Sequence, residues 1–257
     1  MTIRLLTILT ALAVAIGLAV SPAAAKSKRE KAEALVAEAS ETVAYFTDDS
    51  AYEALWELAP DAKAMVIMPK SWRGGFIFGG AGGNAVMVAR TDEGGWSEPT
   101  FFTIGTLSFG LQAGMESSEI ILLVMTQRGM EQLLSTSVKL GGDLSLAAGP
   151  VGGGAKAQTV DVLAFARSRG LYGGMSLEGS ILKARHSWNR EYYGADVSPA
   201  DIIYRGKAAR PHSTLLQSAA WSLAHRMAPA NLAPLQIGDA PEDTVYEDDE
   251  FYGAPLN

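Results

Sequence analysis

The chain contains no cysteine among its 257 residues. Disulfide bonds, thiolate nucleophiles, iron–sulfur clusters and cysteine zinc sites are therefore excluded, and so is a lipid anchor that requires a cysteine. Basic residues are also few, because 21 Lys and Arg stand against 28 Asp and Glu and give a formal net charge of -7. A general nucleic-acid binder needs a basic surface, so we expect no nucleic-acid partner.

Residues that hold metals or cofactors are equally scarce. The three histidines lie far apart, with no carboxylate at metal-ligand spacing: His186, His212 and His225. Residues 149–156 resemble a phosphate-binding loop but are one residue too long, and Ala157 stands where a Ser or Thr would hold magnesium. No dinucleotide fingerprint and no nucleophile elbow is present. We therefore expect no cofactor, no metal and no catalytic residue.

One long hydrophobic run exists, from Leu5 to Val20, and Arg4 is the only charge before it. Pro22 and three alanines follow, so small residues stand where a signal peptidase reads. The pattern predicts a cleavable signal peptide over residues 1–25 and an exported protein, periplasmic or secreted, that is peripheral on a membrane. An uncleaved membrane anchor is the alternative, because the run is almost long enough to span a bilayer.

The region after this run predicts an amphipathic helix over residues 26–46. Its apolar stripe is formed by Leu35, Val36, Ala39, Val43 and Phe46. Its start is basic, with Lys26, Lys28, Arg29 and Lys31. Such a segment suits an anionic lipid surface, although the stripe can equally pack on the rest of the protein. Lys70, Trp72 and Arg73 form a second candidate patch, in which the Trp side chain either meets a lipid interface or plugs the end of a barrel.

Glycine-rich segments with period-two alternation dominate the middle of the chain. Residues 160–167 place Leu163 and Phe165 on one face, and residues 171–178 alternate in the same way. Glycines inside strands are typical of a sheet that bends or bulges. We predict an α+β fold, in which a curved, glycine-rich antiparallel sheet forms a barrel-like core with N-terminal and C-terminal helices packed on it.

Other elements are predicted from their patterns and caps. Further strands are expected over residues 64–68 (ended by Pro69), two within 70–90 with a glycine-rich bend between them, 97–103, 106–115 and 119–125, the last buried on both faces. Further helices are expected over residues 52–58, 126–134, 198–206 and 213–227. Glu178, on a predicted inner strand, and Asp143 are the carboxylates considered for a lipid-modifying hydrolase, the least favoured of three functions.

Several glycine motifs together resemble the SYLF domain family. They are Gly74 to Gly83, Trp96 to Pro99, Gly110 to Gly114, Leu140 to Pro150, Ser168 to Tyr172, Gly174 to Ser180 and Tyr192 to Gly194. The resemblance implies a barrel-like phospholipid-binding module without catalysis or cofactor, with phosphoinositide preference and actin binding in some eukaryotic members. It also implies that an N-terminal amphipathic helix carries membrane contact.

The predicted organisation is a signal peptide (1–25), a lipid-binding domain (26–228, with its core at 42–206) and an acidic, Pro-containing tail (229–257) expected to be disordered. We predict an exported, non-enzymatic phospholipid-binding protein. Its anionic-lipid contacts are expected from Lys26, Lys28, Arg29, Lys31, Lys70, Trp72 and Arg73. The alternative is an envelope adaptor with a protein partner, and actin is not expected to meet an exported protein. Within the lipid hypothesis, the barrel interior is a second place for an acyl chain.

Overall fold

The computed structural model describes residues 26–75, 78–109, 114–149, 160–169, 177–206 and 213–225. The predicted signal peptide and acidic tail lie outside these residues. Strands are β1 (Ala64–Gly75), β2 (Phe78–Ala89), β3 (Thr100–Phe109), β4 (Gly114–Val124), β5 (Ser137–Lys139), β6 (Leu146–Ala148), β7 (Val162–Arg169) and β8 (Ile181–Ala184). Helices are α2 (Lys28–Asp48), α3 (Glu53–Leu58), α4 (Gln127–Leu133), α6 (His186–Tyr193), α7 (Pro199–Ile203) and α8 (Thr214–Ala224).

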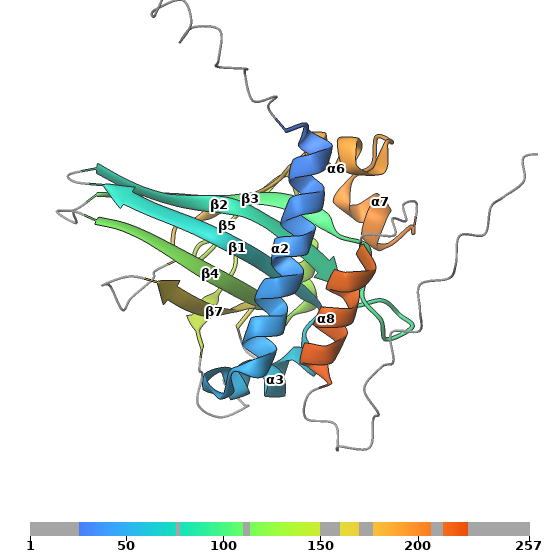
Figure 1. Cartoon of the computed structure of the whole chain (residues 1–257), viewed down its shortest axis with the longest axis horizontal. Coiled ribbons are helices and arrows are strands. Elements are labelled where there is room, and N and C mark those ends of the chain that lie inside the picture. The colour runs from blue at the N-terminus through green and yellow to red at the C-terminus, as the bar shows by residue number, and fades with distance from the viewer. Residues whose placement is uncertain are drawn as a thin grey trace, which may run out of the picture. The chain divides into compact units, whose positions relative to one another are not determined.

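The strands form one sheet in the order β5-β8-β3-β2-β1-β4-β7-β6. Every pairing is antiparallel except that of β6 with β7, which is parallel. The sheet curls into a half-barrel, and α2 crosses it beside α8 (Figure 1). The predicted fold class is therefore confirmed.

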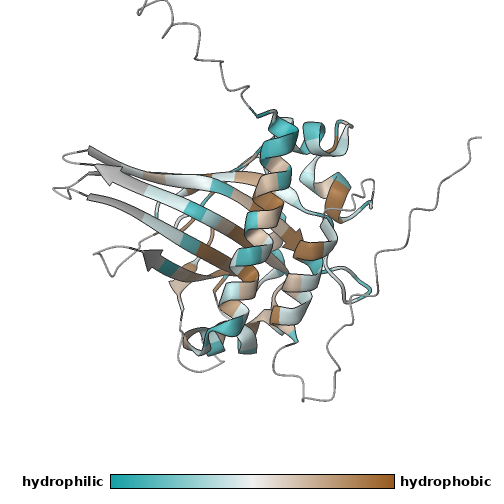
Figure 2. Cartoon of the chain, in the orientation of Figure 1, coloured by the Kyte–Doolittle hydropathy of each residue, from teal (hydrophilic) through white to brown (hydrophobic). Residues whose placement is uncertain are grey.

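Alternation along the strands divides the buried side chains into two cores. The core between the sheet and the helices contains Phe46 of α2, Ile67 of β1, Phe101 of β3 and Leu223 of α8. The core on the other face, inside the half-barrel, includes Met68, Met87, Phe102, Leu122 and Leu182. Figure 2 shows the hydrophobic parts of the strands where α2 and α8 cross them.

Two predicted burial patterns are confirmed in these cores. Leu163 and Phe165 of β7 face the helices, whereas Val162 and Ala164 face the interior. Ile120 to Val124 of β4 are buried on both faces, because helices cover one side of the central strands and the curled sheet encloses the other.

Two strand boundaries predicted from the sequence are wrong. Pro69 does not end its strand, because β1 continues to Gly75 and its register with β2 shifts between Ile67 and Lys70. Such a β-bulge tolerates a residue that cannot donate a backbone hydrogen bond. Residues 97–103 and 106–115 are not separate strands either, since β3 runs without a break past Gly105.

Three further features of the structure differ from the sequence-based expectations. The glycines at 79, 80, 82 and 83 lie inside β2, paired with both neighbouring strands, rather than in a bend. Glu178 lies in an exposed turn and not on an inner strand, and the rest of the predicted strand 171–178 is outside the described residues apart from buried Leu177. Helix α6 was missed, because its polar sequence carries only Trp188, Asn189 and Tyr192 on the buried side.

Candidate functional site

The predicted basic segment forms the exposed first turn of α2. Ser27 caps this helix: its Oγ accepts a hydrogen bond from the Glu30 backbone N–H at 3.1 Å, and Glu30 Oε2 accepts one from the Ser27 N–H at 2.7 Å. These backbone and side-chain bonds with Ser27, aided by nearby Lys26, lower the pKa of Glu30. The cations around the cap are all exposed: Lys26, Lys28, Arg29 and Lys31.

The apolar stripe of α2 faces the protein. Leu35, Val36, Ala39, Val43 and Phe46 are buried against the sheet and α8. Of the two possibilities open from the sequence, the packing alternative is therefore the one observed. The buried stripe cannot lie in a bilayer, whereas the basic end of the helix is exposed and available for contact.

A groove of about 480 Å³ opens beside this basic end. Its lining brings together parts of the chain that are distant in sequence: Lys26, Lys31 and Glu38 from α2, Asn84 from β2, and Arg185 and Trp188 from the start of α6. The apolar flank of α2 at Ala34 and Leu35 closes one side. The groove therefore combines a cationic rim with one aromatic wall.

Arg185 is held in a fixed position in this groove. Its backbone N–H donates to the Phe101 carbonyl oxygen at 2.8 Å, which ties the β8–α6 corner to β3. Its guanidinium donates to Asn84 Oδ1 and lies over the Trp188 ring, with Cζ 4.0 Å from the ring centroid. An arginine held in this way has its remaining donors oriented before a ligand arrives.

The charge of the groove is positive on balance. Glu38, the carboxylate in its lining, forms an ion pair with Lys70 of β1 at 2.7 Å. The negative charge of Glu38 is therefore balanced by a cation. Among the described residues no carboxylate forms an ion pair with Lys26, Lys31 or Arg185. Burial lowers the pKa of Arg185, but a guanidinium remains protonated at neutral pH. The arrangement suits an anion with several acceptor oxygens.

The second predicted patch is brought next to the first. Lys70 reaches α2 through Glu38, and Trp72 lies two residues further along β1 on the same face. Trp72 is 55% exposed, so it does not plug the barrel. The side chain of Arg73 lies outside the described part of the chain.

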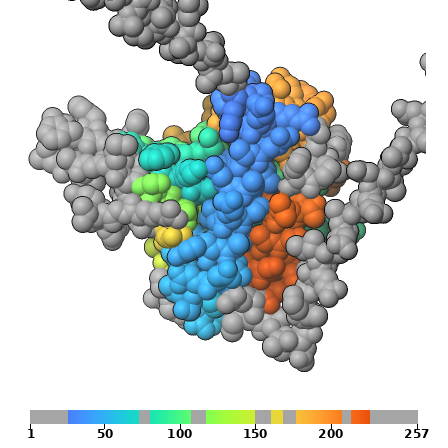
Figure 3. Space-filling model, viewed as in Figure 1, coloured from blue at the N-terminus to red at the C-terminus, as the bar shows by residue number. Residues whose placement is uncertain are grey.

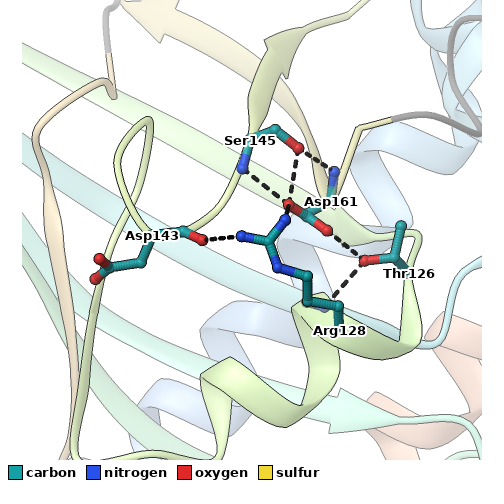
Figure 4. A network of polar contacts seen from close by, with 6 residues as sticks. Thr126, Arg128, Asp143, Ser145 and Asp161 are labelled. Atoms are coloured by element: carbon teal, nitrogen blue, oxygen red, sulfur yellow. Dashed lines mark hydrogen bonds and ion pairs between the residues drawn. The ribbon is translucent and has the colours of Figure 1, made fainter.

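Neither carboxylate considered for hydrolysis sits in a catalytic setting. Glu178 is exposed in a turn, and Asp143 accepts the Lys139 backbone N–H at 2.8 Å within a turn. The buried carboxylate of the described residues is Asp161, which the sequence analysis missed. Figure 4 shows this group among Thr126, Arg128 and Ser145.

Asp161 has a structural role. It accepts hydrogen bonds from Thr126 Oγ1 at 2.6 Å and from the backbone N and Oγ of Ser145 at 3.0 and 2.8 Å, with Arg128 at 3.5 Å. Burial acts to raise the pKa of Asp161, but these donors outweigh it and lower the pKa overall. The ionised group thus fastens the cap of α4 to the β6–β7 edge of the sheet.

Neither a cluster of metal ligands nor a membrane-spanning helix was found in the described ranges. Within them, no three His, Asp or Glu side chains are grouped closely enough to hold a metal ion. None of the helices there combines the length and apolar character that crossing a bilayer requires.

The fold is a curled sheet covered by helices, with a groove that has a cationic rim, and the comparisons identify its family. Residues 105–220 match the family model described as "Ysc84: Las17-binding protein actin regulator". The chain belongs to this family, the Ysc84 or SYLF family, as the glycine motifs predicted. The match includes Arg185 and Trp188 of the groove but not α2.

Curated relatives agree with this assignment. SH3 domain-containing protein PJ696.02 of Schizosaccharomyces pombe is 32% identical over 200 residues, covering 75% of this chain and 44% of that protein. SH3 domain-containing YSC84-like protein 1 of Homo sapiens is 32% identical over 196 residues, covering 74% and 56%. LAS seventeen-binding protein 3 of Saccharomyces cerevisiae is 30% identical over 202 residues, covering 74% and 42%.

The chain therefore spans about half the length of the curated relatives it matches. Their names describe SH3-containing and Las17-binding proteins rather than enzymes. No solved structure was found to match the chain.

Proposed function

We propose that this protein is an exported, non-enzymatic phospholipid-binding protein that attaches to anionic membrane surfaces through the basic end of α2. The observation that carries the proposal is the exposed cluster of four cations at this end, beside a groove whose acid is neutralised by Lys70. Phosphate-bearing headgroups present the negative charge that such a surface attracts. Membership of the SYLF family adds to this support.

The attachment is electrostatic and weak. Each cation near an anionic leaflet contributes about 1 kcal/mol, so four contribute at most about 4 kcal/mol. Arg29 forms an ion pair with Glu33 at 3.1 Å, and Glu30 adds a negative charge at the cap. Both acids reduce the net positive charge that this end of the helix presents to a membrane. Exposed charges are screened over about 8 Å at physiological ionic strength, so binding falls as salt is added.

Vesicle flotation tests the proposal with the chain from Lys26 to Asn257. Wild-type protein floats with vesicles that contain phosphatidylglycerol, floats less at high salt, and does not float with phosphatidylcholine alone. Lys26→Glu/Lys31→Glu abolishes flotation, whereas Lys63→Glu/Lys139→Glu makes the same charge change at exposed positions away from the groove and leaves it intact. Equal flotation of wild-type protein with both vesicle types at low salt would refute the proposal.

Export is tested separately. We propose that residues 1–25 are a signal peptide cleaved after Ala25, which makes Lys26 the first residue of the mature protein. Mass spectrometry of the protein recovered from the periplasm or medium of a Gram-negative host is expected to show this N-terminus. Retention of residues 1–25 in the membrane fraction would support the anchor alternative.

The names of the relatives favour a second candidate, an envelope adaptor with a protein partner. LAS seventeen-binding protein 3 and the family description both refer to binding of another protein. Actin, the partner that the resemblance implies for some eukaryotic members, is not expected to meet an exported chain. Crosslinking in the envelope followed by purification tests this candidate: a stoichiometric protein partner that survives removal of lipid supports it, and recovery of the chain alone counts against it.

A further inference from the structure

A row of four residues crosses the sheet on the face that carries α2. Trp72 of β1 pairs with Gly82 of β2, Gly82 with Gly105 of β3, and Gly105 with Ile181 of β8. Residues directly opposite each other in a sheet point to the same face. Trp72 is 55% exposed and Ile181 is 50% exposed, whereas the two glycines between them have no side chain. The row is therefore a shallow trough with a backbone floor and an apolar side chain at each end.

The trough is large enough for part of a lipid. Neighbouring strands lie about 4.8 Å apart, so three steps from β1 to β8 separate Trp72 and Ile181 by about 14 Å. Glycerol and the first methylenes of two acyl chains fit within such a span.

The trough adjoins the cationic groove. The next row of the sheet contains Lys70, Asn84, Thr103 and Lys183, which are paired in the same register. Two residues along a strand correspond to about 7 Å, so the apolar and cationic rows are immediate neighbours. Asn84 is the residue that holds Arg185 in the groove. Figure 3 shows part of the surface of β1 to β3, in teal and green, beside α2 in blue.

The two glycines differ in what the fold requires of them. A Cβ on Gly82 would lie 2.8 Å from the Ile104 carbonyl oxygen, so close approach of the backbones explains that glycine. A Cβ on Gly105 would meet nothing within 4 Å, and Gly105 is not among the glycines with positive φ. Neither packing nor backbone conformation in the described residues accounts for Gly105, which leaves open space above it.

We infer that the groove and the trough together bind one molecule of an anionic phospholipid. Its phosphate lies among Lys26, Lys31 and Arg185, and its glycerol and the start of its acyl chains lie over Gly82 and Gly105, between Trp72 and Ile181. The inference rests on the proposed function and adds a stoichiometric site to it. Apolar contact is thereby supplied by the sheet, since the stripe of α2 is already buried.

The test uses a lipid that does not form a bilayer. Isothermal titration calorimetry of the chain from Lys26 to Asn257 with dihexanoyl phosphatidic acid, below its critical micelle concentration, is expected to show one site. Inorganic phosphate is the second probe and is expected to bind at least about tenfold more weakly, because it leaves the trough empty.

Two variants separate the parts of the site. A Cβ at position 105 would meet nothing within 4 Å, so Gly105→Val is expected to fill the trough, weaken the lipid about tenfold and leave phosphate binding unchanged. Gly95→Val is the matched control, since a Cβ there makes only an ordinary 3.5 Å contact with Thr91 Oγ1 in a distant turn. Arg185→Lys keeps the charge but loses the planar fork, and is expected to weaken both probes.

The outcomes also distinguish this inference from the proposed function. If anionic vesicles bind but dihexanoyl phosphatidic acid does not, the single-lipid site is refuted and surface attachment stands. The inference is likewise overturned if Gly105→Val and Gly95→Val, both folded by circular dichroism, bind the lipid equally. If inorganic phosphate binds as tightly as the lipid, the trough contributes nothing to the affinity and is not part of the site.

Discussion

Replacing Asp161 with alanine should destabilise the protein far more than removing an exposed acid. The carboxylate is buried and accepts three hydrogen bonds of 2.6 to 3.0 Å from Thr126 and Ser145. In the variant these donors lose their acceptor. Thr126 also caps α4 by accepting the Gly129 N–H, so the loss reaches the start of that helix.

The magnitude follows from these bonds. A hydrogen bond to a charged group contributes about 1.5–3 kcal/mol, which gives about 4.5 kcal/mol for three bonds at the low end. Water can reach part of the network from the side of Arg128, whose side chain is 66% exposed, and it reduces this loss. We therefore expect the free energy of unfolding at pH 7 to fall by about 3 kcal/mol.

The pH dependence of this effect has a definite sign. The pKa of Asp161 is lowered in the folded protein, so its contribution is complete above the unfolded pKa of about 3.9 and is lost as the pH falls through the folded value. The difference in unfolding free energy between wild type and Asp161→Ala is expected to narrow as the pH falls from about 5 through the lowered pKa of the folded protein.

Urea unfolding followed by tryptophan fluorescence measures both quantities. Asp196→Ala is the control, because Asp196 is 79% exposed and paired with Arg190, and it should cost at most about 1 kcal/mol. The reasoning fails if Asp161→Ala loses no more stability than this control at pH 7, or if the gap is the same at pH 3 as at pH 7.

Three further predictions concern the groove and the glycines. Gly83→Ala should lower thermal stability by about 2 kcal/mol, since its Cβ would overlap the Lys70 carbonyl oxygen, while Gly105→Ala should be nearly neutral in the same melting experiment. Ser27→Ala removes the cap of α2 and should cost about 1 kcal/mol, with faster amide exchange confined to the first turn. Glu38→Gln removes the ion pair with Lys70, leaves the Lys70 ammonium free, and should increase flotation with anionic vesicles. A decrease in flotation would show that the ion pair is needed to hold the site in its binding geometry.

Signals that are local in the sequence predicted much of the fold. Thr126 and Ser198 were expected to start helices, and both accept the capping hydrogen bonds that define α4 and α7. The alternation of Leu163 and Phe165 placed β7 correctly because burial on one face imposes a period of two. The capped helix α2 followed from its apolar stripe.

Long-range packing explains what the sequence did not reveal. Helix α6 is held by two contacts with Phe101: Asn189 Oδ1 accepts the Phe101 backbone N–H at 3.0 Å, and the Tyr192 ring packs against the Phe101 ring. No local sequence pattern encodes these contacts. The cations of α2 were visible as a cluster, but Arg185 and Asn84 are 101 residues apart and meet only through strand pairing. The trough is hidden for a related reason, since two of its four positions are glycines.

The position of Lys26 on the rim of the groove gives export a chemical consequence. If the leader is removed after Ala25, as proposed, the cut creates a new α-ammonium group on Lys26, with a pKa of about 8. Maturation would then add a cation to the groove, so that the precursor carries a weaker anion receptor than the protein released from it. Proteolysis would in that case activate the receptor as well as deliver it.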